Sequence, residues 1–195
     1  ALAPTAFTIT STITFDGAVL NGISAATIAA AASTAALGSD ATASATVTVV
    51  ASYAYVIDDI PTGTTSTSIA SALQTAACAG DTGCTVTLSS SDGRRLSALA
   101  SLPAALSAAA ARRRLVSSTF TVADPLSGAE TVSLPAVDSS SLAASLGSSV
   151  ASALTVSGSI SSVAAQVTYV DTGSNLDADD VVMTGTLSPT TLASA

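Results

Sequence analysis

Two cysteines are the residues of this sequence with the clearest covalent chemistry. Cys78 and Cys84 stand at the ends of the stretch CAGDTGC, and no other cysteine occurs in the 195 residues. The five residues between them include two glycines, and a turn of this kind is short enough to bring the sulfurs together. This pattern predicts a local disulfide formed in an oxidising compartment, with two unrelated buried thiols as the alternative. The spacing differs from the C-x-x-C of redox pairs.

General acid–base and nucleophilic catalysis find little support in the residue types. The sequence contains no histidine and no lysine, so the usual bases that activate a serine are missing. No G-x-S-x-G, phosphate-binding or dinucleotide-binding glycine pattern occurs. The adjacent carboxylates of Asp58 and Asp59, or of Asp179 and Asp180, are the remaining candidates for an acid pair, but neighbours on a strand point to opposite faces. We therefore expect no enzyme and no cofactor.

A cluster of oxygen-bearing side chains occupies DTGSNLDADD, residues 171–180. Carboxylates and amides at alternating positions are calcium ligands in other proteins, but this stretch lacks the glycine and the final glutamate of an EF-hand loop. We interpret it as an acidic hairpin loop between two strands. Without histidine, and with one pair of thiols, the chain offers no zinc site either, so we expect no bound metal.

Hydroxyl groups are the most abundant polar chemistry of the chain. Neither Asn21 nor Asn175 opens an N-x-Ser/Thr motif, which excludes N-linked glycans. Clusters of serine and threonine beside proline are typical of O-glycosylated loops. The candidate sites are Thr5, Thr62, Thr64, Thr65, Thr190 and Thr191. The alternative is that these hydroxyls are only the polar surface of a chain with few charges.

The five basic residues are all arginines, and they flank one Ala/Leu-rich segment, residues 92–115. They are Arg94, Arg95, Arg112, Arg113 and Arg114. Three interpretations remain open: pairing with the excess acids on the protein's own surface, proteolytic processing, or the basic half of a charged joint. In the third, the acids of one copy dock onto the arginines of the next, and such a head-to-tail contact builds filaments.

Charge and hydropathy exclude two classes of partner. The net charge of −8 argues against nucleic acid, which requires a basic face, and against an anionic membrane surface. The longest nearly apolar run, residues 98–111, is shorter than the roughly 20 residues that span a bilayer. We expect no membrane insertion.

Periodicity predicts an α+β protein. Apolar and polar residues alternate over 7–15, 46–57, 84–88, 116–122, 163–170 and 181–187, which predicts strands, with 46–57 either one long strand or a tight pair. Helical spacing covers 23–37, 68–78 and 138–154, the last helix beginning at Asp138 or the serines after it.

This order predicts tandem split β-α-β units of the ferredoxin-like type, with antiparallel sheets covered by helices on one face. The expected boundaries are 1–91 for a first β-α-β(β)-α-β unit, 92–115 for the arginine-flanked insert, and 116–195 for a second β-α-β unit with a C-terminal strand. A β-solenoid is the runner-up, although no fixed short repeat supports it.

The segments DGRRLSAL and ARRRLVSS, joined to Ala/Ser/Thr/Val-rich halves, resemble domains of large secreted surface proteins of algae and other microbial eukaryotes. In those proteins an R-R-L segment sits between two such halves. The resemblance is one of composition and covers most of residues 7–170. This chain departs from the pattern in having two arginine clusters around a long insert, which leaves the domain boundary open. It implies an extracellular structural role in a cell wall or fibre, and nothing about catalysis.

We therefore expect a secreted, extracellular or cell-surface structural subunit that assembles with copies of itself into a glycosylated fibre. FTITSTITF near one end and VVMTGTL near the other are candidates for strand addition to a neighbour's sheet. The alternative is an adhesion or binding module of a larger surface protein. Carbohydrate sites usually need exposed aromatics, and of Tyr53, Tyr55 and Tyr169 two fall on the apolar phase of their strand, where we expect core positions.

Overall fold

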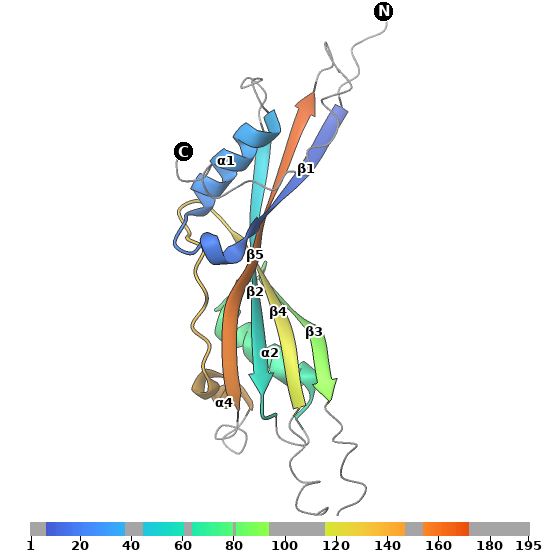
Figure 1. The fold of residues 1–195 in the computed structure, drawn as a ribbon, viewed down its shortest axis with the longest axis vertical. Helices are drawn as coiled ribbons and strands as arrows, with labels where there is room; N and C mark the ends of the chain where they lie inside the picture. Colours follow the sequence, from blue (N-terminus) through green and yellow to red (C-terminus); the bar gives the residue numbers. More distant parts are fainter. Residues whose placement is uncertain are drawn as a thin grey trace, which may run out of the picture. The chain divides into compact units, whose positions relative to one another are not determined.

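The computed structural model describes residues 7–37, 45–60, 64–79, 81–93, 116–146 and 154–171 (Figure 1). Its elements are β1 (Phe7–Asp16), the 3-10 helix η1 (Gly17–Val19), α1 (Ala25–Leu37), β2 (Ala45–Asp58), α2 (Ser66–Cys78), β3 (Thr85–Gly93), β4 (Val116–Leu126), α4 (Ser139–Leu146) and β5 (Thr155–Asp171). The strands form a five-stranded antiparallel sheet in the order β1-β5-β2-β4-β3. The predicted α+β class is confirmed.

The chain divides into two compact units. Unit 1 comprises Ala1–Ser52, Pro125–Ser133 and Ile160–Ala195, and unit 2 comprises Tyr53–Asp124 and Leu134–Ser159. Strands β2 and β5 therefore contribute residues to both units, and each unit draws on chain from both sides of the insert 92–115. Residues 94–115 of that insert, and the expected strand 181–187, lie outside the described residues.

Unit 1 contains the predicted N-terminal strand. β1 pairs with β5 over ten consecutive residue pairs, from Phe7 opposite Asp171 to Asp16 opposite Ser162, without a bulge. The side chains of Ile13 and Phe15 are buried, because residues two apart on a strand share a face. The intervening threonines are exposed, as the alternation predicts; they are Thr8, Thr10, Thr12 and Thr14.

The predicted alanine-rich helix follows as α1, which buries Ala25, Ile28 and Ala32. Ser24 begins it, because its hydroxyl accepts a hydrogen bond of 3.2 Å from the Thr27 amide. The segment after β4 returns to this helix start, where Ser24 forms an isolated bridge with Thr131. The buried Val132 donates its amide to the carbonyl of Ile23 at 2.9 Å, which fixes the return segment in unit 1.

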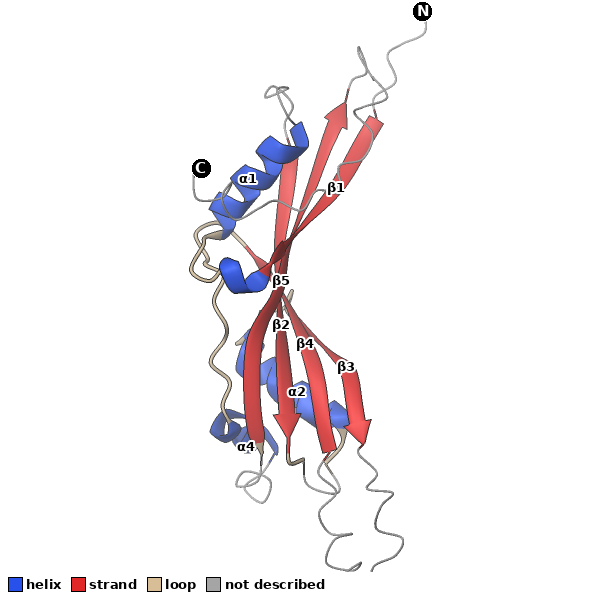
Figure 2. Cartoon of the chain, viewed as in Figure 1, coloured by secondary structure: helices blue, strands red, loops and turns tan. Residues whose placement is uncertain are grey.

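Unit 2 follows the order β2-α2-β3-β4-α4-β5, and its strands lie in the order β5-β2-β4-β3. Helix α2 packs against α4 and against β3, and Figure 2 shows both helices behind the strands of this unit. The fully buried side chains of the unit include Tyr53, Tyr55, Ile57, Ile69, Leu73, Phe120, Val122 and Leu142. The core is therefore built largely from the apolar phases that the sequence displays.

Two elements differ from the expectation. The helix predicted over 138–154 ends at Leu146 within the described residues, and Leu154 is not helical. The strand predicted over 163–170 is the end of the longer β5, which begins at Thr155. By contrast, the question of one strand or two over 46–57 is answered by the single strand β2.

Candidate functional site

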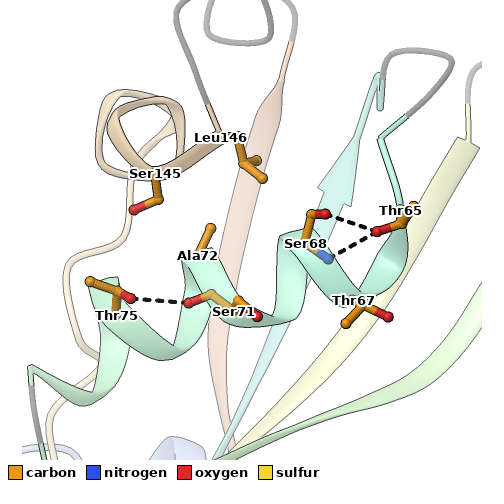
Figure 3. Close-up of a pocket in the computed structure, with 8 residues that line it drawn as sticks. All are labelled: Thr65, Thr67, Ser68, Ser71, Ala72, Thr75, Ser145 and Leu146. Carbon is orange, nitrogen blue, oxygen red and sulfur yellow. Dashed lines mark hydrogen bonds between the residues drawn. The ribbon is translucent and has the colours of Figure 1, made fainter.

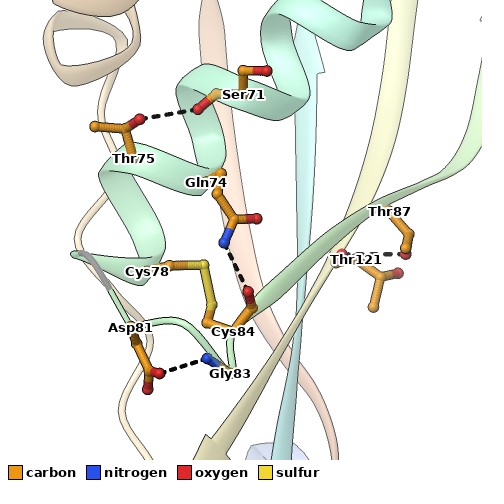
Figure 4. The surroundings of a disulfide bond; sticks show 9 residues. All are labelled: Ser71, Gln74, Thr75, Cys78, Asp81, Gly83, Cys84, Thr87 and Thr121. Atoms are coloured by element: carbon orange, nitrogen blue, oxygen red, sulfur yellow. Dashed lines mark hydrogen bonds between the residues drawn. A yellow bond between two sulfur atoms is a disulfide. The ribbon is translucent and has the colours of Figure 1, made fainter.

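The disulfide is the first candidate feature that the structure brings together. Cys78, the last residue of α2, is bonded to Cys84, directly before β3, and their Cα atoms are 5.7 Å apart (Figure 4). The predicted bond is confirmed. Both residues are buried, and Ala79 adopts a left-handed φ of 45° at the helix end, which turns the chain toward β3. The bond therefore ties the end of α2 to the start of a sheet strand.

Hydrogen bonds reinforce this connection. The Gln74 side-chain amide donates to the Cys84 carbonyl at 2.7 Å. The Asp81 carboxylate accepts from the Gly83 amide at 2.8 Å, an Asx turn that shapes the loop between the cysteines. Spacing predicted the disulfide, but it gave no sign of Gln74, whose role depends on how α2 packs against β3.

A shallow groove of about 440 Å³ lies in unit 2 beside α2 and the end of α4 (Figure 3). Six of its eight lining residues carry hydroxyls and none is charged; the lining consists of Thr65, Thr67, Ser68, Ser71, Ala72, Thr75, Ser145 and Leu146. Such a surface donates and accepts hydrogen bonds but supplies no acid or base near neutral pH. No sequence pattern points to this groove, because its serines and threonines occupy ordinary polar positions at the start and along the surface of two helices.

Some hydroxyls that line this groove already form hydrogen bonds within α2. The Thr65 hydroxyl begins α2 by accepting from the Ser68 amide at 3.1 Å, and it lies 2.9 Å from the Ser68 hydroxyl. The Thr75 hydroxyl donates to the Ser71 carbonyl at 3.1 Å.

Of the candidate glycosylation residues, Thr65 is exposed and Thr64 half-buried. The other four, Thr5, Thr62, Thr190 and Thr191, lie outside the described residues.

The two edges of the sheet differ in how they are protected. In the described part of the chain, β1 and β3 each have a strand neighbour on one side only. The pairing of β3 with β4 shifts register between Leu88 and Ser90, which makes Ser89 a bulge, and a bulge discourages pairing with another strand. β1 has neither a bulge, nor a proline, nor any charge before Asp16.

The exposed face of β1 continues across β5. Thr10 lies opposite Thr168, and their hydroxyl oxygens are 3.3 Å apart. Thr12 lies opposite the exposed Gln166, and Thr8 opposite Val170, whose side chain is 52% exposed. Up to Asp16, this face of unit 1 is therefore an uncharged surface of threonines, Gln166 and the apolar Val170 that extends to an open strand edge.

Two of the three tyrosines belong to the core. Tyr53 and Tyr55 are both buried in unit 2, which confirms the expected core positions, while Tyr169 is half-buried in unit 1. Burial raises the pKa of Tyr55 well above its usual value, with a further contribution from the nearby Tyr53. Its hydroxyl donates to the Pro135 carbonyl at 2.7 Å.

The acidic candidates do not converge within the described residues. Asp58 ends β2, and Asp59 has a φ of 60° and accepts a hydrogen bond of 3.3 Å from the Thr155 hydroxyl. No group of three or more His, Cys, Asp or Glu side chains close enough to hold a metal occurs in this part of the chain. The arginines at 94, 95 and 112–114, the acids of 172–180 and the pair Asp179 and Asp180 lie outside it.

No helix in the described ranges is both long enough and apolar enough to cross a bilayer. Comparisons of the chain with protein-family models, with curated proteins and with solved structures find no match.

Proposed function

We propose that this chain is an extracellular structural subunit that assembles with copies of itself into a fibre or surface filament, with strand addition as one of its contacts. The observation that carries the proposal is the edge of β1. Ten residues pair regularly with β5 on one side, and the strand is uncharged up to Asp16. Long, flat edges without protection are templates for pairing with another chain.

Two further features support this function. The buried Cys78–Cys84 disulfide is of the kind that persists in oxidising surroundings such as the cell exterior. The exposed side chains of β1 before Asp16 are uncharged threonines, which suits a surface that neighbouring copies of an acidic protein approach closely. O-linked glycans on the proline-adjacent hydroxyls, and a head-to-tail joint through the arginine clusters, complete the proposal.

The finer fold assignment belongs to the same proposal. The element order β-α-β-β-α-β and the strand order β5-β2-β4-β3 of unit 2 favour a ferredoxin-like arrangement. Unit 1, with β1, α1 and parts of β2 and β5, is then the incomplete second unit. In this arrangement an open strand edge belongs to the incomplete unit.

Electron microscopy of the purified, oxidised protein in negative stain tests the function. Filaments whose formation weakens as salt increases are expected, because the arginine joint is electrostatic. Monodisperse particles at every salt concentration would contradict the proposal. Intact mass measured on protein secreted by a eukaryotic host shows in parallel whether hexose-sized increments are present and whether the arginine clusters are cleaved.

The hydroxyl-lined groove beside α2 favours a second candidate, a binding module for a hydroxylated ligand such as a glycan. Its neutral donors and acceptors match sugar hydroxyls, although in the described residues no aromatic side chain lines it. Binding of soluble oligosaccharides, followed by the chemical shifts of α2, tests this candidate. If a Ser71→Leu variant binds oligosaccharides as well as the wild type, the groove is not the binding site.

A further inference from the structure

The nine residues of β1 before Asp16 read the same in both directions. They are Phe-Thr-Ile-Thr-Ser-Thr-Ile-Thr-Phe, residues 7–15, with Ser11 at the centre. The pairing with β5 uses one edge of this strand, and β1 is the last strand in the sheet order. A palindromic strand therefore stands at an edge that has no other strand neighbour among the described residues.

We propose that this edge binds the same strand of a second copy, antiparallel, about a two-fold axis at Ser11. In that register Ser11 faces Ser11 of the second copy, Thr10 faces Thr12, and Ile9 faces Ile13. An isologous contact requires a surface that is complementary to itself, and a palindrome satisfies this requirement at every position. The proposal rests on the proposed function, because it specifies one of the contacts by which copies assemble.

The charges of the chain are compatible with this contact. Each copy carries a net charge of −8, and such copies repel unless they meet where no acids face each other. Residues 7–15 carry no charge, and Asp16 lies beyond the palindrome. The other edge strand, β3, has the sequence TVTLSSSDG with a bulge at Ser89. It is neither symmetric nor regular, so the same contact does not form there.

The cross-strand pairs that this register creates have a counterpart within the chain. Thr10 already meets Thr168 of β5, with hydroxyl oxygens 3.3 Å apart. The proposed pairs between Thr10 and Thr12 repeat that contact across the axis, and Thr–Thr pairs of this kind stabilise sheets.

A two-fold contact closes on itself, so a fibre requires a second contact of another kind. The head-to-tail arginine joint supplies one, and the repeating unit of the fibre is then a dimer. The contact through β1 and the formation of fibres are consequently separable in experiments.

Cysteine cross-linking tests the register. In a Ser11→Cys variant the two introduced residues face each other at the axis, at a Cα separation of about 4.5–5.5 Å, which a disulfide spans. Mild oxidation is expected to give a covalent dimer in non-reducing electrophoresis. Thr14→Cys is the matched control, because the thiol introduced at position 14 faces Thr8 of the second copy and stays uncross-linked. Equal dimer yields from the two variants, or none from either, would overturn the register.

Charge substitutions test the same contact in solution. Thr10→Lys with Thr12→Lys places lysine opposite lysine twice, and is expected to weaken dimerisation about tenfold in sedimentation equilibrium. Thr10→Glu with Thr12→Lys places opposite charges together and restores the dimer. Gln166→Lys with Val170→Lys adds the same charge on β5, one strand from the edge, and serves as the control. If Thr10→Lys/Thr12→Lys and the control Gln166→Lys/Val170→Lys dimerise equally well, the contact is refuted.

These outcomes separate the inference from the proposed function. If the Ser11→Cys variant forms a cross-linked dimer but the protein forms no filaments, the β1 contact is supported and the proposed fibre is rejected. Filaments formed by a Thr10→Lys/Thr12→Lys variant whose dimerisation is not weakened uphold assembly and remove this contact. A wild-type protein that is monomeric by sedimentation, with the edge covered by its own chain, removes the contact as well.

Discussion

The Tyr55 hydroxyl donates a hydrogen bond of 2.7 Å to the carbonyl oxygen of Pro135, 80 positions further along the chain. Tyr55 lies on β2 and is buried, while Pro135 belongs to the extended segment that leads to α4. The bond holds that segment against the core of unit 2. It also satisfies the hydroxyl, which is the single polar group of the Tyr55 side chain. A buried tyrosine is usually placed so that its hydroxyl finds such a partner.

Removal of this hydroxyl is expected to destabilise the protein without changing its fold. Tyr55→Phe leaves the ring in place but leaves the Pro135 carbonyl without its donor, at a cost of about 1 kcal/mol. Urea unfolding, with wild type and Tyr169→Phe compared side by side, measures the difference. The half-buried Tyr169 is the control, and an equal loss in both variants would contradict the role assigned to the Pro135 bond.

The raised pKa of Tyr55 leads us to expect that the protein loses stability at high pH. Burial raises its pKa in the folded protein above the ordinary value of 10.0. The unfolded chain therefore releases this proton first, so the free energy of unfolding falls as the pH rises above about 10. Unfolding curves at pH 9, 10 and 11 should show this decline in wild type and a smaller one in Tyr55→Phe. Parallel declines would assign the effect to other groups.

At low pH we expect stability to fall as the pH decreases, because of Asp138. Its carboxylate accepts from the Ser141 amide at 2.7 Å and from the Ser141 hydroxyl at 2.8 Å, and these bonds lower its pKa. The stabilisation is present above the ordinary carboxyl pKa and is lost as the pH falls through the lowered value. Asp138→Ala should lower the melting temperature at pH 7. Asp138→Asn should retain the cap with less dependence on pH, because asparagine also begins helices.

The disulfide is expected to contribute stability rather than activity. Replacing Cys78 and Cys84 together by serine removes a short cross-link and is expected to cost about 2 kcal/mol by the loop-entropy relation. Reduced wild type and the oxidised protein are compared by thermal unfolding. Since the bond anchors the start of β3, hydrogen exchange of the β3 amides should accelerate more than that of β1. Uniform acceleration would show that the bond does not act locally.

The sequence predicted the strands and helices whose side chains alternate or repeat clearly. β1 was predicted from its alternating threonines and isoleucines, α2 from Ile69 and Leu73, and the start of α4 at Asp138 or the serines after it, of which the structure shows Asp138 as the cap. The disulfide was found because its two cysteines stand in one short loop. These features depend on neighbours in the sequence, so local patterns contain them.

Features that depend on distant segments did not appear in the pattern. The stretch TVSGSISS, residues 155–162, is polar, contains a glycine and was assigned to no helix or strand, yet it forms the first half of β5. The assignment of β2 and β5 to both compact units likewise follows from long-range pairing. The open edge of β1 became visible only with the strand order, because alternation shows which face is buried but not which strand lies alongside.

Gly158, within this stretch of β5, is a glycine whose position has a physical reason. A Cβ atom at this position would lie 2.8 Å from Tyr55 Cε1 and 3.2 Å from Leu134 Cδ2, so glycine is present because the Tyr55 ring approaches the backbone closely. Gly158→Ala is therefore expected to cost about 1–3 kcal/mol through overpacking, although alanine is ordinarily no worse than glycine in a strand. Ser159→Ala, the exposed neighbour, should change stability by less than about 0.5 kcal/mol. Denaturant unfolding of both variants decides the point: if Gly158→Ala is as stable as Ser159→Ala, close contact with Tyr55 does not explain the glycine.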